Sequence, residues 1–172
     1  MPLSADDLKT VIAVAALLFS LISLKKKKKN WVQSNRPIVT AFVVEHSSGN
    51  TGAVFNLVLA NSGSRPAVRV RMHASSENIK RLLESNASRK HIQMIESNFL
   101  KSSEVPLLRN GEELTTSFGA FSTDADRDPW LKYGSETEIV ITYQDLDGRK
   151  FESRLPLKIY AREGFGGGVW GD

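Results

Sequence analysis

An uncharged apolar stretch near the N-terminus constrains this chain more than any other feature. Residues 10–24 read TVIAVAALLFSLISL and contain no charged side chain, and their only polar residues are Thr10, Ser20 and Ser23. As a helix the stretch spans about 22 Å, against a hydrocarbon core of about 30 Å. Leu8 lengthens it, and the flanking lysines can bury their stems while their ammonium groups reach the interface. The stretch therefore predicts one transmembrane helix.

Two alternatives fit this stretch less well. A cleavable signal peptide carries positive charge before its apolar region and small residues at a cleavage site after it. Here Asp6 and Asp7 come before the stretch, five lysines follow it, and no small-x-small site separates Leu24 from the lysines. A helix buried in a soluble protein needs a polar face, and residues 11–19 offer none. A signal-anchor helix is the preferred interpretation.

The lysines that follow the stretch predict its orientation. They are Lys25, Lys26, Lys27, Lys28 and Lys29, with Trp31 just beyond them, where an interfacial aromatic side chain would lie. Positive flanks stay in the cytoplasm, and only Lys9 and the α-amino group stand on the other side. We therefore expect a single-pass protein of the cell inner membrane whose C-terminal domain is cytoplasmic. The lysines would attract anionic lipids at about 1 kcal/mol per residue; the alternative is a merely solvated linker.

The remaining charge is balanced. The formal net charge of +4 is already present in residues 1–30, so the other 142 residues carry 17 basic and 17 acidic side chains. A neutral domain has no global electrostatic attraction to nucleic acid, and we expect no nucleic-acid partner. The absence of cysteine excludes disulfides, thiolate metal sites and cysteine nucleophiles.

From Pro37 onward the chain shows short apolar runs separated by turn residues, which is typical of β-structure. The dipeptide Asp147-Gly148 predicts a tight hairpin turn, because glycine tolerates the positive φ that such turns require. The first two predicted strands, residues 38–44 and 53–60, are apolar on both faces, so both could be central in their sheet. The predicted strands are residues 38–44, 53–60, 68–73, 114–121, 138–144 and 150–160.

The third of these strands alternates cleanly. Val68, Val70 and Met72 should share one face, and Arg69 and Arg71 should share the other with His73. After it, Ser75 or Ser76 can cap a helix that ends near Asn86, while the stretch up to Pro106 is ambiguous between helix and irregular strand.

Together these patterns predict a mainly β fold: an antiparallel β-sandwich with a helical insertion, preceded by the transmembrane helix. The expected divisions are a short N-terminal segment at 1–9, the span at 10–24, a basic linker at 25–36, the sandwich at 37–160 and a flexible glycine-rich tail at 161–172. The expected core includes Phe55, Leu57, Leu59, Val70, Ile139, Ile141, Leu155 and Leu157.

Two segments resemble motifs of immunoglobulin-like bacterial sandwich modules of the CARDB type. Residues 59–70 (LANSGSRPAVRV) are similar to a strand-loop-strand pattern L-x-N-x-G-x-x-P-A-x-x-V, and residues 143–151 (YQDLDGRKF) to a hairpin pattern Y-x-D-x-x-G-x-x-[YF]. The resemblance covers residues 37–159 and implies an immunoglobulin-like sandwich that binds, spaces or presents. Neither motif carries chemistry in those families, and the insertion between residues 75 and 106 departs from their pattern.

Groups that could carry catalysis or hold a metal do not combine into a site. His46, His73 and His91 lie far apart and in no ligand spacing. Asp124, Asp126 and Asp128 occupy the first positions of a calcium loop, but the glycine and the bidentate glutamate that such a loop needs are replaced by Pro129 and Ser135. No serine lies in a nucleophile elbow. We therefore expect no metal, no cofactor and no catalytic residue.

Binding residues are easier to nominate. Arg69 and Arg71 could bind an anionic ligand or lipid headgroups, although such alternation is usually the solvated side of a strand. Phe165 and Trp170 of the tail could dock into a partner. The preferred function is a non-enzymatic, membrane-tethered interaction module, an adaptor or accessory subunit of a membrane assembly with a protein partner. The alternatives are an exported sandwich that binds an envelope component, and an enzyme with an unrecognised site, which a concave pocket with convergent polar groups would indicate.

Overall fold

The structure, a computed structural model, describes residues 5–124 and 130–160, and for residues 5–8 and 10–13 only the backbone is described. The chain divides into two units, Met1–Arg36 and Pro37–Asp172, which are treated separately below. The first unit contains the helix α1 (Ala5–Ser34) of 30 residues. The lysines that were predicted to form a linker therefore belong to the helix, since α1 continues through them to Ser34.

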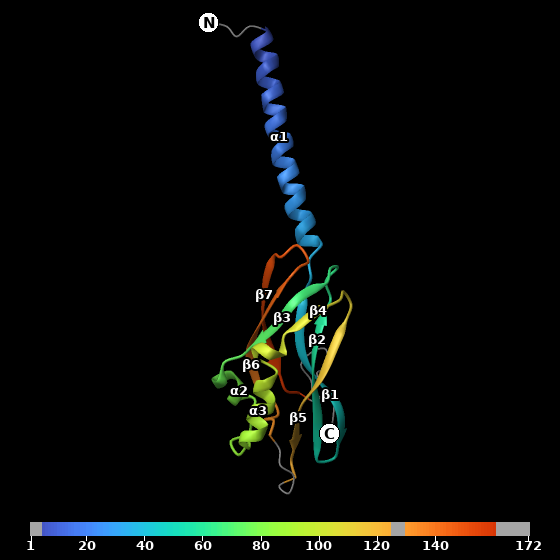
Figure 1. Ribbon diagram of the computed structural model, residues 1–172, viewed down its shortest axis with the longest axis vertical. Coiled ribbons are helices and arrows are strands. Elements are labelled where there is room, and N and C mark those ends of the chain that lie inside the picture. The colour runs from blue at the N-terminus through green and yellow to red at the C-terminus, as the bar shows by residue number, and fades with distance from the viewer. Residues whose placement is uncertain (1–4, 125–129, 161–172) are drawn as a thin grey trace. The chain divides into compact units, whose positions relative to one another are not determined.

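Where the structure describes it, the second unit is built from seven strands in two antiparallel sheets (Figure 1). The three-stranded sheet has the order β1-β2-β5, from β1 (Val39–Gly49), β2 (Gly52–Asn61) and β5 (Glu113–Ser122). The four-stranded sheet has the order β4-β3-β6-β7, from β4 (Val105–Leu108), β3 (Ala67–His73), β6 (Glu136–Gln144) and β7 (Lys150–Lys158). The prediction of a mainly β, antiparallel fold with some helix is confirmed.

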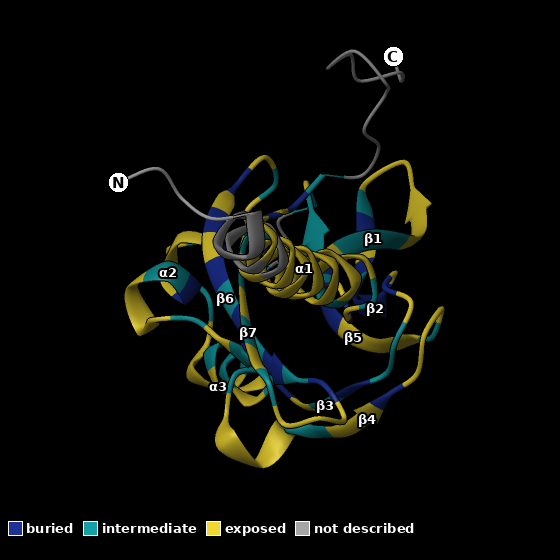
Figure 2. Cartoon of the chain, turned by 90° about the horizontal axis from the view of Figure 1, so that it is seen from above, coloured by how far each residue is buried: buried dark blue, intermediate teal, exposed yellow. Residues whose placement is uncertain are grey.

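Both sheets contribute side chains to one core, as alternation along a half-buried strand requires. Figure 2 shows buried residues along the strands of both sheets. The core predicted from the sequence is confirmed: Leu155 is half-buried and packs against it, and the others are buried, namely Phe55, Leu57, Leu59, Val70, Ile139, Ile141 and Leu157.

The prediction that the first strand could be central is wrong, because β1 is an edge strand. β2 is central, between β1 and β5. The edge of β1 lies against β7 of the other sheet, which closes this side of the sandwich. A strand can therefore be apolar on both faces without a neighbour on each side, when its edge is covered by the facing sheet.

The helical insertion lies between β3 and β4 and contains α2 (Ser76–Arg81), α3 (Arg89–Ser97) and the 3-10 turn η1 (Lys101–Ser103). The Ser75 cap is confirmed, since its hydroxyl accepts a hydrogen bond of 3.1 Å from the backbone N–H of Asn78. The predicted end near Asn86 is wrong. The chain leaves the helix at Arg81 because Leu82 and Leu83 are buried in the core, and Leu83 pairs with Leu131 in a short bridge.

The regular alternation predicted along β3 is interrupted. Val68 pairs with Gln144 and Arg71 pairs with Thr142, so two residues of β3, Arg69 and Val70, stand opposite one residue of β6. This is a β-bulge. Its consequence is that Val68 lies outside the core cluster, whereas Val70 belongs to it.

Within the part of the chain that the structure describes, no helix is both long and apolar enough to cross a membrane. The segment predicted to span, residues 10–24, falls only partly within that part, because the side chains of residues 10–13 are not described.

Candidate functional site

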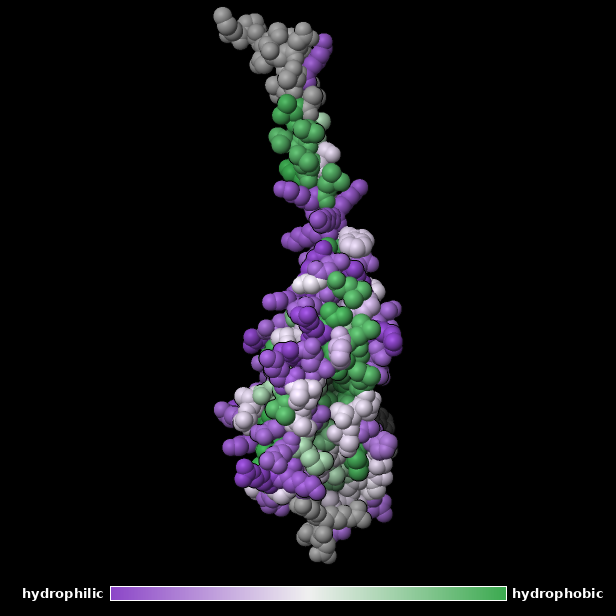
Figure 3. Space-filling view, in the orientation of Figure 1, coloured by the Kyte–Doolittle hydropathy of each residue, from purple (hydrophilic) through white to green (hydrophobic). Residues whose placement is uncertain are grey.

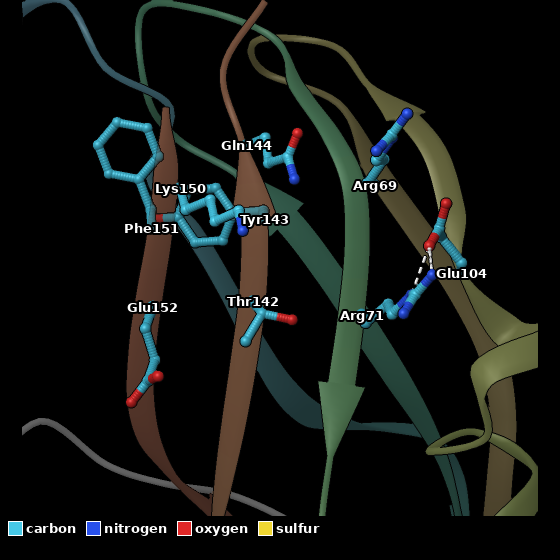
Figure 4. Close-up of a pocket in the computed structure, with 9 residues that line it drawn as sticks. All are labelled: Arg69, Arg71, Glu104, Thr142, Tyr143, Gln144, Lys150, Phe151 and Glu152. Carbon is cyan, nitrogen blue, oxygen red and sulfur yellow. Dashed lines mark hydrogen bonds and ion pairs between the residues drawn. The ribbon is translucent and has the colours of Figure 1, made fainter. Parts of the chain in front are cut away.

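A groove of about 460 Å³ lies on the four-stranded sheet, over β3, β6 and β7. We call it the outer groove. Figure 4 shows its lining, in which β3 supplies arginines, β6 supplies polar side chains and β7 supplies a lysine and a glutamate. The residues that line it are Arg69, Arg71, Glu104, Thr142, Tyr143, Gln144, Lys150, Phe151 and Glu152.

The bulge in β3 shapes one wall of the groove. Arg69 has φ = +54°, and it is the one residue other than glycine with positive φ among those that the structure describes. Side chains disfavour this left-handed region, because Cβ approaches the following carbonyl oxygen. Strain of this kind persists only where the surroundings impose it, and it gathers at functional sites. Here the pairing of β3 with β6 on both sides of the bulge imposes it.

Three of the five charged residues that line the groove are neutralised by ion pairs. The guanidinium of Arg71 forms an ion pair with the carboxylate of Glu104. The carboxylate of Glu152 accepts a hydrogen bond of 3.0 Å from Nε of Arg154. In contrast, Arg69 and Lys150 form no ion pair or side-chain hydrogen bond with any described residue. Over residues 5–124 and 130–160, the groove therefore offers two cations without a partner, Arg69 and Lys150.

Polar side chains lie on β6 between these cations. Oγ1 of Thr142 is 2.9 Å from Nε2 of His73, which fixes the threonine side chain. Gln144 carries an amide that can donate and accept, and it has no partner among the described side chains. Gln144 is the direct neighbour of Lys150 on β7 and of Val68 on β3. One strand thus separates the two free cations, and it presents a free amide between them.

The groove lies near the end of the sandwich at which the domain begins. We call this the Pro37 end, and it contains the loops at 62–66, 109–112 and 145–149. The hydroxyl of Tyr143 donates a hydrogen bond of 3.4 Å to the carbonyl of Pro37, and the N–H of Gly111 donates one of 2.8 Å to the carbonyl of Asn61. Gln144 and Lys150 directly flank the loop at 145–149, so the groove opens beside this end.

Asn61 holds the Pro37 end together. Its side chain is buried and makes four hydrogen bonds: Oδ1 accepts from the N–H groups of Ile38 at 3.1 Å and Gly63 at 3.0 Å, while Nδ2 donates to the carbonyls of Arg65 at 2.8 Å and Leu108 at 3.2 Å. All its hydrogen-bonding capacity is used. One asparagine therefore joins the starts of β1 and of the β2–β3 loop to the end of β4.

The β6–β7 hairpin is organised by Asp145, whose buried carboxylate accepts hydrogen bonds of 2.9 Å from the backbone N–H groups of Asp147 and Arg149. Arg65 reaches this hairpin from the β2–β3 loop, with Nη1 2.7 Å from Oδ2 of Asp147. This hydrogen bond lowers the pKa of Asp147 below its ordinary value of 3.8 and raises the pKa of Arg65. The guanidinium of Arg65 is thus occupied, unlike the cations of Arg69 and Lys150 in the outer groove.

The structure brings together some of the residues nominated from the sequence. Arg69 and Arg71 both line the outer groove, but Arg71 is engaged by Glu104. Lys150 and Gln144 were not nominated, because only the pairing of β6 with both neighbours places them beside Arg69. Lys25, Lys26, Lys27, Lys28, Lys29 and Trp31 are exposed on α1.

Other nominated residues fall outside the description or form no cluster. Asp126, Asp128, Phe165 and Trp170 lie outside the described residues. Over residues 5–124 and 130–160, no group of three or more histidine, aspartate or glutamate side chains could hold a metal ion.

The fold and the groove define a small β-rich protein whose two sheets follow an N-terminal helix and whose outer face carries free cations. The chain belongs to the family described as Domain of unknown function (DUF8453), which it matches over residues 5–161. The match includes α1 as well as both sheets, so the helix is part of the architecture that the family shares. No curated protein matches the chain.

Proposed function

We propose that this protein is a non-enzymatic interaction module tethered to a membrane by residues 10–24 of α1, and that it serves as an adaptor or accessory subunit of a membrane assembly. The sandwich presents the outer groove, and the helix keeps it at the bilayer. The single observation that carries the proposal is the exposed apolar surface of α1.

Seven large apolar side chains of α1 are between 49% and 73% exposed, namely Val14, Leu17, Leu18, Phe19, Leu21, Ile22 and Leu24. Figure 3 shows this apolar surface followed by the hydrophilic lysines. Burying one such side chain contributes about 1.5–3 kcal/mol, so leaving all seven in water forgoes about 10 kcal/mol or more. At 100° per residue they point to most sides of the helix. Lipid tails can cover all of those sides, whereas a single protein surface covers one face.

The described side chains of the apolar stretch, those of residues 14–24, cover too little length along the helix to cross a membrane. The sequence supplies the rest, since Thr10, Val11, Ile12 and Ala13 carry no charge. The five lysines then favour an arrangement in which the sandwich is cytoplasmic. A short span also makes insertion sensitive to any charge placed at its centre.

The strand order supports an immunoglobulin-like assignment of the sandwich. In such folds strands A, B and E lie in one sheet and C′, C, F and G can form the other. Lettering β1 to β7 in chain order as A, B, C, C′, E, F and G reproduces both sheets, with α2 and α3 inserted between C and C′. Modules of this architecture commonly bind partners through their faces and loops. The resemblance to CARDB-type modules stays a prediction.

Replacing Leu17 by arginine should release the protein from membranes. Leu17 is the central residue of the stretch at 10–24, and arginine at the centre of a span costs about 3 kcal/mol on insertion scales, which a span this short cannot absorb. The measurement is the fraction of the full chain that stays with membranes after alkaline carbonate extraction. The control is Leu17→Phe, which keeps the site apolar and should be retained. Equal retention of Leu17→Arg and the unaltered chain would contradict the tether.

A further inference from the structure

We propose that the outer groove binds the phosphate group of a phosphate ester, held between Arg69 and Lys150 above Gln144. The site goes beyond the proposed tether and does not depend on it. The identification of a lipid as the source of that phosphate does rest on the proposed tether. The experiment below distinguishes phosphate binding at the groove from a lipid source of the phosphate.

The spacing of the strands fits such an anion. Neighbouring strands are about 4.8 Å apart, so the backbones of β3 and β7 are separated by roughly 10 Å with β6 between them. Lys150 and Gln144 are paired across β6 and β7, and Arg69 follows Val68, the partner of Gln144 on β3. In Figure 4, Lys150 extends from β7 toward β6, and Gln144 points from β6 toward β3. Lys150 and Gln144 thus lie together, whereas the guanidinium of Arg69 points away from Gln144 in Figure 4 and has to turn about its side-chain bonds to reach the same anion.

The chemistry of these donors favours phosphate over a carboxylate. A guanidinium, an ammonium and an amide N–H₂ together offer more donors than the two oxygens of a carboxylate can accept in one plane. The three non-ester oxygens of a phosphate monoester diverge and can meet donors that arrive from different strands. Both cations lack partners among the described residues, so no ion pair has to be broken before the anion binds.

The backbone at Arg69 supplies a second reason. The strained, positive φ of +54° places a long cationic side chain at a bulge where glycine would be the unstrained residue. The bulge moves Arg69 out of the regular alternation and leaves it exposed beside the groove. If the groove needs a cation at this position to bind an anion, that need explains why arginine stands where glycine would be unstrained.

The position of the groove favours a lipid headgroup as the source of the phosphate. Gln144 and Lys150 flank the loop at the Pro37 end, and Pro37 directly follows the first unit. From Lys25 to Ser34 the helix is about 15 Å long, so the Pro37 end is the part of the sandwich nearest along the chain to the proposed span. A phosphorylated headgroup in the same leaflet is then present at high local concentration.

The test uses the isotope-labelled full chain in zwitterionic detergent and follows the backbone and arginine side-chain NMR signals. The probes are inorganic phosphate, glycerol 3-phosphate and, after transfer to phosphatidylcholine nanodiscs, added phosphatidic acid. Saturable shifts at Arg69, Gln144 and Lys150 support the site. Shifts with phosphatidic acid identify a lipid source, and shifts with the soluble probes alone identify a free phosphate.

The variants make the assignment specific. Arg69→Gln and Lys150→Gln should each weaken binding by about tenfold, because each removes one charge-assisted hydrogen bond. Lys158→Gln removes the same charge from the same strand, away from the groove, and should bind as the unaltered chain does. Arg69→Gly should lose binding with an unchanged or higher melting temperature, which separates lost binding from lost folding. The proposal is overturned by the absence of saturable shifts, or by Arg69→Gln and Lys150→Gln variants that bind phosphate as tightly as the unaltered chain does. Shifts with a polyglutamate peptide but not with phosphate would also overturn it.

Discussion

Replacing Asn61 with leucine should lower the free energy of unfolding by about 4 kcal/mol or more. The substitution leaves four backbone groups without their partner, the N–H groups of Ile38 and Gly63 and the carbonyls of Arg65 and Leu108. An unsatisfied buried polar group costs about 1–3 kcal/mol, and Asn61 is 1% exposed, so water does not replace the lost bonds without rearrangement. Urea unfolding of the full chain in mild detergent, followed by circular dichroism, measures the change.

A neighbour on the same strand provides the control. Asn56 of β2 is half-buried and has no side-chain partner among the described residues, so Asn56→Leu should change the free energy of unfolding by less than about 0.5 kcal/mol. If the two leucine variants were equally stable, the role of Asn61 at the Pro37 end would be wrong.

Truncating Phe55 to alanine should cost about 3–5 kcal/mol, because a buried phenylalanine leaves both lost apolar contacts and a cavity. Phe55 is fully buried on the central strand of the three-stranded sheet, where it faces the core shared with the other sheet. The same urea measurement applies.

Val54 is the matched control for Phe55. It is adjacent on β2, points to the opposite face and is 38% exposed, so Val54→Ala should cost no more than about 1 kcal/mol. A larger loss at Val54 than at Phe55 would mean that the faces of β2 are assigned the wrong way round.

Much of the sandwich was predictable because apolar and polar residues alternate along its strands and turn residues separate them. The hairpin around Asp147-Gly148 is an example, since Gly148 has the positive φ of +79° that the dipeptide suggested. β4 escaped prediction because it has only four residues and contains Pro106, which cannot donate a ladder hydrogen bond. An edge strand tolerates that loss, but which strand lies at an edge is decided by tertiary pairing.

The candidate site was predictable only in part. Arg69 and Arg71 could be nominated from the alternation along their strand. The sequence did not show that Arg71 forms an ion pair with Glu104, whereas Arg69 has no ion-pair partner among the described residues. The bulge has no local signal, because arginine is a poor choice for positive φ and the extra residue appears only in the pairing of β3 with β6. Gln144 and Lys150 look like ordinary exposed strand residues until β6 is placed between β3 and β7.

The two motifs behind the family resemblance have structural roles in this chain. Asn61 of the first motif joins three segments through its side-chain hydrogen bonds, and Asp145 of the second caps its hairpin. Neither residue lines the outer groove. Two other fixed positions of the second motif, Tyr143 and Phe151, do line the groove, but the proposed phosphate donors lie at variable positions of the motifs.

The central claim is that residues 10–24 cross a membrane and leave the sandwich in the cytoplasm. The natural chain has no cysteine, so single cysteines can be placed without background, at Ser4 on one side of the span and at exposed Lys132 on the other. In intact cells a membrane-impermeant thiol reagent should label Ser4→Cys but label Lys132→Cys only after lysis. Labelling of Lys132→Cys without lysis, or protection of both cysteines until lysis, would contradict the account.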